Sequence, residues 1–169
     1  YAKLAGDLGA RVGFVIADLD ADGSLIPLAD CSQDAVLASL LISYLREPRH
    51  LLAEAVRVLV PGGRIVVSTL RPDADTSALV TKGIAELRMG HGSERVSRLS
   101  DVELESTLRD FIHDAAKLLD LEEQGVFRFW DRGDLRQLLE AVGLQNVRVV
   151  RAYGSPPQVL VAVGTKRVS

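Results

Sequence analysis

The side chains that could do chemistry are few and lie far apart in the sequence. The three histidines, His50, His91 and His113, do not follow the spacing of a metal site. The single cysteine, Cys31, can form neither an internal disulfide nor a cysteine zinc cluster. A histidine beside a binding pocket can act as a general base, so His91 and His113 are candidates, with surface or packing roles as the alternative.

One run of acidic residues invites a metal-binding interpretation. Asp18, Asp20 and Asp22 alternate and are followed by Gly23, which resembles the start of a calcium-binding loop. Such a loop needs a further acidic residue six positions on, where this sequence has Ala29, and it needs flanking helices. We therefore expect no metal site here, and the run is interpreted as a polar break after an apolar strand.

The elements around these residues alternate between strands and a helix. Apolar runs predict strands at 11–17, 34–39 and 64–70, and a helical repeat at 48–59 follows the second of them. The turn residues at 61–63 end that helix. A strand, a helix and a strand in this order predict a parallel pair with a right-handed crossover. The continuous apolar runs also predict a sheet that is covered on both faces.

Residues 71–125 interrupt this alternation. Two helical patterns, at 77–90 and 101–120, follow one another with no strand between them. We interpret the segment as a helical insertion and as a candidate lid over a binding site.

The last part of the chain returns to sheet elements. Asp131 is a predicted N-cap for a helix at 132–142, which ends at Gly143. Strands at 146–153 and 158–164 are joined by a short turn, which predicts a closing antiparallel hairpin. The whole chain, residues 1–169, is therefore expected to be a single α/β domain with a helical insertion.

The composition is that of an ordinary globular protein with an aliphatic core. Of the 169 residues, 47% are hydrophobic, 5% are aromatic and the net charge is -3, which argues against a nucleic-acid partner. No apolar run reaches the length of a membrane span, and the first residues do not resemble a signal peptide. With one thiol, the chain fits a reducing compartment, and we expect a cytoplasmic location.

Several segments of the sequence resemble class I S-adenosylmethionine-dependent methyltransferases of the small-molecule type. The resemblance rests on a predicted strand that ends in Asp18, on the later Pro27 and Asp34, and on the stretch from Arg57 to Gly63, which reads RVLVPGG. The closing helix and hairpin also match, so the resemblance covers nearly the whole chain except the insertion. The RVLVPGG stretch is its most specific part.

The resemblance implies a Rossmann-like methyltransferase sheet, mostly parallel, and S-adenosylmethionine as the cofactor. It implies that Asp18 accepts a hydrogen bond from the adenine amino group and that the Leu19 N–H meets a ring nitrogen. It implies that Ser39 and Leu40 lie beside the methionine part. Tyr44, which follows the same strand, is a further candidate to face a small-molecule substrate, with packing as the alternative.

The family's glycine-rich cofactor loop and the acid that binds the ribose are absent from the sequence. Both would precede Tyr1, so we expect the chain to be the C-terminal portion of the enzyme. A missing N-terminal segment or a second chain would complete the sheet. The function expected from the resemblance is methyl transfer to an oxygen, nitrogen or carbon of a small molecule.

Two other functional classes are alternatives to a methyltransferase. A non-catalytic methyltransferase-like module acting through protein partners fits the absent cofactor loop. Another nucleotide-binding α/β enzyme is disfavoured by the closing hairpin and by the Arg57–Gly63 wording.

Overall fold

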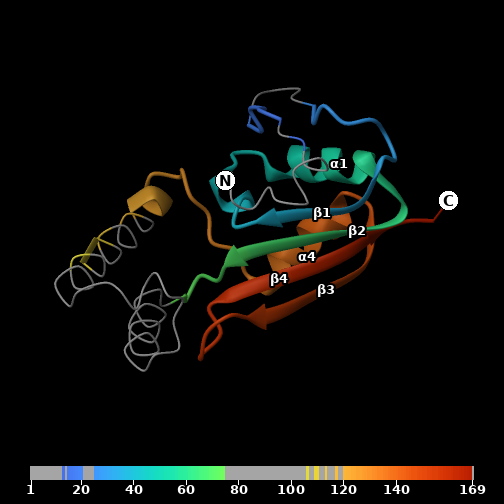
Figure 1. Cartoon of the computed structure of the whole chain (residues 1–169). Helices are drawn as coiled ribbons and strands as arrows, with labels where there is room; N and C mark the ends of the chain where they lie inside the picture. Colours follow the sequence, from blue (N-terminus) through green and yellow to red (C-terminus); the bar gives the residue numbers. More distant parts are fainter. Residues whose placement is uncertain are drawn as a thin grey trace, which may run out of the picture.

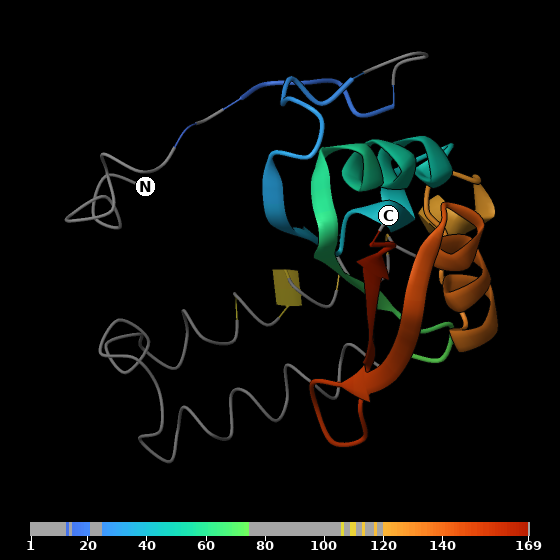
Figure 2. The same cartoon turned by 90° about the vertical axis from the view of Figure 1, so that its right-hand side faces the viewer.

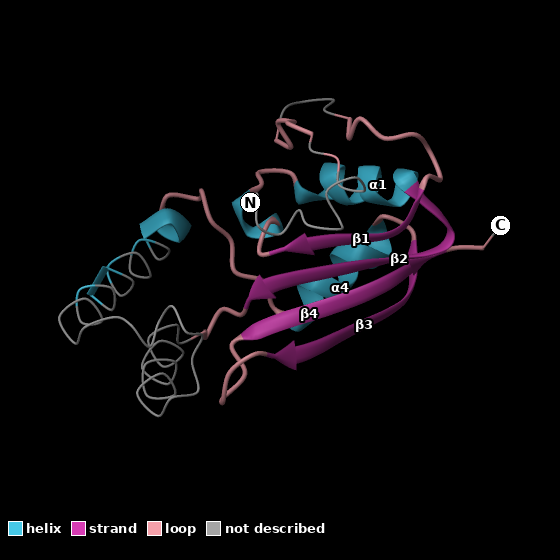
Figure 3. Cartoon of the chain, in the orientation of Figure 1, coloured by secondary structure: helices cyan, strands magenta, loops and turns pink. Residues whose placement is uncertain are grey.

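The computed structural model describes residues 13, 15–20, 25–74, 106, 109–110, 113, 117 and 120–168. In chain order the elements are β1 (Gln33–Ser39), the 3-10 helix η2 (Ile42–Tyr44), α1 (Pro48–Val58), β2 (Leu59–Leu70), α4 (Arg132–Ala141), β3 (Leu144–Ala152) and β4 (Val159–Lys166). The four strands form one open sheet in the order β1-β2-β4-β3 (Figures 1 and 3).

The strand directions follow the expected pattern. β1 pairs with β2 in parallel, and α1 makes the crossover between them. β4 pairs with β2 and with β3, and both of these pairs are antiparallel. The parallel pair and the closing hairpin are therefore confirmed, and the sheet is a mixed one similar to Rossmann-like methyltransferase sheets.

Both long helices cover the same face of the sheet (Figure 2). The buried positions alternate along the strands because successive side chains point to opposite faces. The core joins side chains of both helices to those of all four strands: Ala38, Leu52, Ala55, Ile65, Val67, Leu135, Leu139, Val147, Val149, Leu160 and Ala162.

The other face of the sheet carries apolar side chains that remain accessible. Leu37 on β1 is 71% exposed and Val150 on β3 is 54% exposed. The expectation of a sheet covered on both faces is therefore wrong for the described part of the chain, where α1 and α4 lie on one side only. The continuous apolar runs arise because the open face also carries apolar side chains: Leu37, Val66, Val150, Val161 and Val163.

The local signals for the two helices are confirmed. Pro48 lies in the first turn of α1, which buries Leu51, Leu52, Ala55 and Val58. α4 begins after Asp131, whose carboxylate accepts a hydrogen bond from the Asp134 N–H at 2.7 Å, an N-cap contact. Gly143 follows α4 with φ +88°, a left-handed conformation that glycine adopts without a Cβ clash.

The predicted strand at 11–17 is wrong for the residues of it that the structure describes. Residues 13 and 15–17 have no strand conformation, and Val15 and Ile16 are exposed. A strand needs a neighbour to pair its backbone groups, and the register of the sheet pairs β1 with β2 alone. The apolar run is real, but nothing among the described residues pairs with it.

The insertion can be compared with the structure only in part. Residues 106, 109–110, 113, 117 and 120–123 are helical, in agreement with the pattern at 101–120. The first predicted helix, at 77–90, lies outside the described residues. Within the described part of the chain, no helix is long and apolar enough to cross a membrane.

Candidate functional site

The carboxyl ends of β1 and β2 meet at one edge of the sheet, which is where open α/β sheets bind ligands. Ser39, the last residue of β1, lies opposite Ser68 of β2. Their hydroxyl oxygens are 3.1 Å apart, at hydrogen-bond distance. The Leu40 N–H donates to the Ser68 carbonyl at 2.9 Å and to its hydroxyl at 3.2 Å. Ser68 therefore fixes the backbone of Leu40, which the resemblance implies to lie beside the methionine part of the cofactor.

Leu40 itself has an unusual backbone. Its φ is +51°, in the left-handed region that a residue with a Cβ rarely occupies. Such conformations cost free energy and are found at sites where the surrounding contacts impose them. Here the Leu40 N–H, which donates to the Ser68 carbonyl and hydroxyl, supplies those contacts, and η2 follows two residues later.

A buried pair of hydroxyls lies beneath this turn. Ser43 in η2 and Thr69 in β2 are 2% and 0% exposed, and their oxygens are 2.8 Å apart. The Ser43 carbonyl also accepts the Arg128 N–H at 2.9 Å. The pair joins η2 to β2, and the carbonyl joins both to the extended segment that follows the insertion.

Aromatic rings line the same edge. Tyr44 contacts Phe127 edge-on, with ring centroids 4.9 Å apart, and Phe127 contacts Phe129 at 5.0 Å. Trp130 is buried in the core and stacks under the Arg128 guanidinium at 4.0 Å. These contacts attach residues 127–130, which follow the insertion, to the sheet. Tyr44 is half exposed, so it packs on one side and remains accessible on the other.

Asp18 and Leu19 lie on a segment that is fixed to this edge by an ion pair. The Asp20 carboxylate accepts hydrogen bonds from the Arg46 backbone N–H at 2.9 Å and from Arg46 Nε at 2.7 Å. Arg46 follows η2 by two residues. The hydrogen bond from the Arg46 side chain holds the pKa of Asp20 below its usual value. Residues 18–20 are thus attached to the chain just beyond Leu40.

A cavity of about 260 Å³ lies between this segment, β1 and α1. Ala17 and Leu19 line it from one side and Leu41, which follows the β1 end, lines it from another, so Asp18 lies between two of the lining residues. All of its lining residues have apolar side chains: Val15, Ala17, Leu19, Ile26, Pro27, Val36, Leu37, Ala38, Leu41, Leu51, Leu52, Ala55 and Ile65. The cavity therefore offers a mainly apolar surface to a flat ring.

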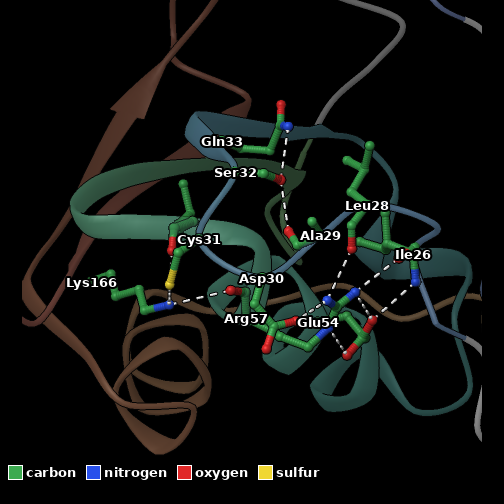
Figure 4. Close-up of polar contacts among 11 residues, drawn as sticks. Ile26, Leu28, Ala29, Asp30, Cys31, Ser32, Gln33, Glu54, Arg57 and Lys166 are labelled. Atoms are coloured by element: carbon green, nitrogen blue, oxygen red, sulfur yellow. Dashed lines mark hydrogen bonds and ion pairs between the residues drawn. The ribbon is translucent and has the colours of Figure 1, made fainter.

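The RVLVPGG stretch lies at the opposite end of the sheet and has a structural role (Figure 4). The Arg57 guanidinium donates to both oxygens of Glu54, at 2.8 and 2.9 Å, and to Asp30 at 2.5 Å. It also donates to the carbonyls of Ile26, at 2.8 Å, and Leu28, at 3.0 Å. This single side chain holds the loop before β1 against α1.

The glycines of that stretch serve the same junction. A Cβ on Gly63 would lie 2.8 Å from the Val60 carbonyl and 3.2 Å from the Asp34 carbonyl, so only glycine fits. Gly62 has φ +80°. Residues 61–63 lie within β2, and not in a turn that precedes it. Asp34, near the start of β1, is at this end too, as predicted.

The remaining candidates are placed as follows. His113 is helical and exposed, and His50 is exposed on α1. His91 lies outside the described residues. Among the residues that the structure describes, no group of three His, Cys, Asp or Glu side chains could hold a metal ion.

Known proteins that are similar to this chain agree with its fold and with the resemblance in its sequence. Residues 2–67 match the family described as "Methyltransferase domain". The chain is 31% identical over 163 residues to malonyl-[acyl-carrier protein] O-methyltransferase of Hahella chejuensis, covering 91% of this chain and 51% of that protein.

The sequence is therefore similar to methyltransferases, in agreement with the resemblance to the class I S-adenosylmethionine-dependent family.

A second curated protein and a solved structure are also similar to this chain. Demethylmenaquinone methyltransferase of Clavibacter sepedonicus is 48% identical over 65 residues, which are 38% of this chain and 24% of that protein. The structure of 1,6-didemethyltoxoflavin-N1-methyltransferase from Burkholderia thailandensis has a TM-score of 0.57 at 18% identity, covering 98% of this chain and 56% of that one. The chain spans about half the length of the Hahella chejuensis methyltransferase.

Sequence reasoning found some residues of the carboxyl edge and missed others. Ser39, Leu40 and Tyr44 do lie together there, and Asp18 and Leu19 are attached to the same edge. Ser68 could have been found by aligning the ends of the two parallel strands. The contact between Arg46 and Asp20 had no signal, because neither residue belongs to a periodic pattern.

Proposed function

We propose that the protein to which this chain belongs transfers a methyl group from S-adenosylmethionine to an oxygen, nitrogen or carbon of a small molecule. In this proposal the Asp18 carboxylate accepts a hydrogen bond from the adenine amino group and the Leu19 N–H donates to a ring nitrogen. Ser39 and Leu40 border the methionine part. The bound sulfonium supplies an electrophilic methyl group, and the chain's residues orient it and exclude water.

The observation that carries this proposal is the attachment of residues 18–20 to the carboxyl end of β1. The two halves of the proposed cofactor site are 20 residues apart in the sequence, and the Asp20–Arg46 contact joins them. The apolar cavity beside Leu19 fits the faces of an adenine ring. The described residues therefore suit the two ends of the cofactor that the resemblance assigns to them.

The ribose hydroxyls and the amino-acid end of the cofactor need further polar groups. We propose that these come from strands that pair with the outer edge of β1, supplied by a preceding segment of the same gene product or by a second chain. The position of β1 at the edge of the described sheet and its exposed Leu37 support this, because an unpaired apolar edge strand otherwise promotes association.

The acceptor is proposed to be a small molecule, a class that includes the substrates named for the relatives. Residues 71–125 are proposed to form a lid over it, in a cytoplasmic enzyme. Among the described candidates Tyr44 is the best placed, because it is half exposed at the carboxyl edge. His113 and His91, in the insertion, are proposed alternatives for a general base.

Calorimetric titration of S-adenosylhomocysteine tests the cofactor site. The titration is made with this chain and with the longest gene product that contains it, each as wild type, Asp18→Ala and Asp34→Ala. Asp34→Ala is the matched control, because it removes a carboxylate at the amino end of β1. We expect Asp18→Ala to weaken binding about tenfold, the value of one charge-assisted hydrogen bond, and Asp34→Ala to leave it unchanged.

Two results would contradict the proposal. Equal effects of the two substitutions would remove Asp18 from the site. No binding to any wild-type form would favour the alternative function, a module that keeps the fold and acts through protein partners.

A further inference from the structure

Residues 15–20 belong to no helix or strand, yet three hydrogen bonds fix their last residue. The Arg46 backbone N–H and Nε donate to the two oxygens of the Asp20 carboxylate, at 2.9 and 2.7 Å. Arg46 Nη2 donates to the Asp20 carbonyl at 3.3 Å. Donors from both the main chain and the side chain of Arg46 thus bind Asp20.

The contact continues from Asp20 to Asp18. The Asp20 N–H donates to Asp18 Oδ1 at 3.0 Å, which closes a two-residue turn around Leu19. The position of the Asp18 carboxylate, and the direction of the Leu19 N–H inside the turn, therefore depend on where Asp20 is held. Arg46 sets that position from a point just after η2, on the chain that leaves the β1 end.

The exposure of the pair shows that its effect is on geometry. The Arg46 side chain is 78% exposed and that of Asp20 is 27% exposed. Ion pairs this accessible add little to folding stability. The guanidinium nevertheless restricts the orientation of Asp20, because Nε donates to its carboxylate and Nη2 to its carbonyl, a pair of contacts that a lysine cannot reproduce.

We propose that Arg46 is a positioning residue for the adenine of the cofactor, which holds Asp18 and Leu19 at the carboxyl end of β1 through Asp20. The inference rests on the proposed function, because it assumes that Asp18 and Leu19 contact the adenine. It adds a residue that touches no cofactor atom and sets the selectivity for the adenine amino group.

The test compares two ligands that differ at that amino group and at the ring nitrogen beside it. Binding of S-adenosylhomocysteine and of S-inosylhomocysteine, which has an oxygen in place of the amino group and a hydrogen on the adjacent ring nitrogen, is measured by calorimetry. The proteins are the longest gene product containing this chain and its Arg46→Ala, Asp20→Asn and Arg49→Ala variants. Arg49→Ala is the matched control, because it removes a nearby guanidinium that donates to the Ala141 carbonyl, at 3.4 Å, and not to Asp20.

We expect the wild type and Arg49→Ala to prefer the adenine ligand by about tenfold, the value of a charge-assisted hydrogen bond. Arg46→Ala is expected to bring this ratio close to one, and Asp20→Asn to reduce it by a smaller factor. Thermal unfolding of each variant, with a midpoint close to that of the wild type, confirms that the fold is intact.

The outcomes separate the two proposals. A ratio that Arg46→Ala leaves unchanged, even if both ligands bind more weakly, means that Arg46 is merely structural, and it overturns this inference alone. Wild-type protein that binds neither ligand overturns the proposed function, and the inference with it.

Discussion

Removing the hydroxyl of Thr69 should destabilise the protein by more than its small size suggests. Thr69→Val keeps the shape of the side chain but leaves the Ser43 hydroxyl, which is 2% exposed, without the partner at 2.8 Å. A buried polar group that loses its partner costs about 1–3 kcal/mol. For a chain of 169 residues, about 2 kcal/mol lowers the unfolding midpoint by about 4–8 °C.

The converse substitution should be milder. Ser43→Ala leaves the Thr69 hydroxyl with a second contact, to the Leu70 carbonyl at 3.4 Å, so the cost is expected to be about 1 kcal/mol. The double variant removes both polar groups and should cost less than the sum of the two single variants, by about 1 kcal/mol. Thr165→Val, at a partly exposed position of β4, is the matched control and should change stability by less than about 0.5 kcal/mol.

Urea unfolding of the four variants and the wild type measures these differences. Additive effects of the two single substitutions would show that the hydroxyls do not interact. A Thr69→Val variant as stable as Thr165→Val would show that η2 does not need this contact. Either result would refute the reasoning that joins η2, and so the carboxyl edge, to β2.

Two further predictions concern the amino end of the sheet. Gly63→Ala should lower the free energy of unfolding by about 1–3 kcal/mol, because its Cβ would lie 2.8 Å from the Val60 carbonyl; Gly125→Ala, where only φ +72° opposes the new Cβ, should cost less, and the opposite order in thermal unfolding would contradict the contact. The Arg57 hydrogen bond lowers the pKa of Glu54 below its usual 4.5, so the folded state binds that proton less readily than the unfolded state. The resulting stability is present above pH 4.5 and is lost as the pH falls through the lowered pKa. Stability measured from pH 6 to pH 3 should therefore fall less steeply in Arg57→Gln, and equal slopes would rule out the coupling.

The sequence predicted best those features that depend on neighbouring residues. The apolar stripe of α1, the Asp131 cap and the Gly143 end of α4 follow from helix geometry and backbone preference, and all are present. The closing hairpin was equally clear, since its strands are adjacent in the chain.

What depends on distant contacts was harder to predict. The run at 11–17 has the composition of a strand, but composition does not supply the neighbour that a strand requires. The left-handed backbone of Leu40 could not be predicted either. A leucine side chain disfavours a positive φ, and the hydrogen bond to Ser68 that accompanies it joins residues far apart in the sequence. The resemblance to a family predicted Asp18, whereas no sequence pattern predicted Arg46, which binds Asp20.

The order of the strands has a consequence for biosynthesis. β4 is the last strand of the sheet in the chain and lies between β2 and β3. While the chain is being made, β2 and β3 therefore leave the ribosome before the strand that joins them exists. α4 and β3 can pack on each other at that stage, but they cannot dock onto β1 and β2 in register. Cooperative folding of the described sheet must wait for residues 159–166, so a chain that stops before residue 159 would leave β3 unjoined to β1 and β2.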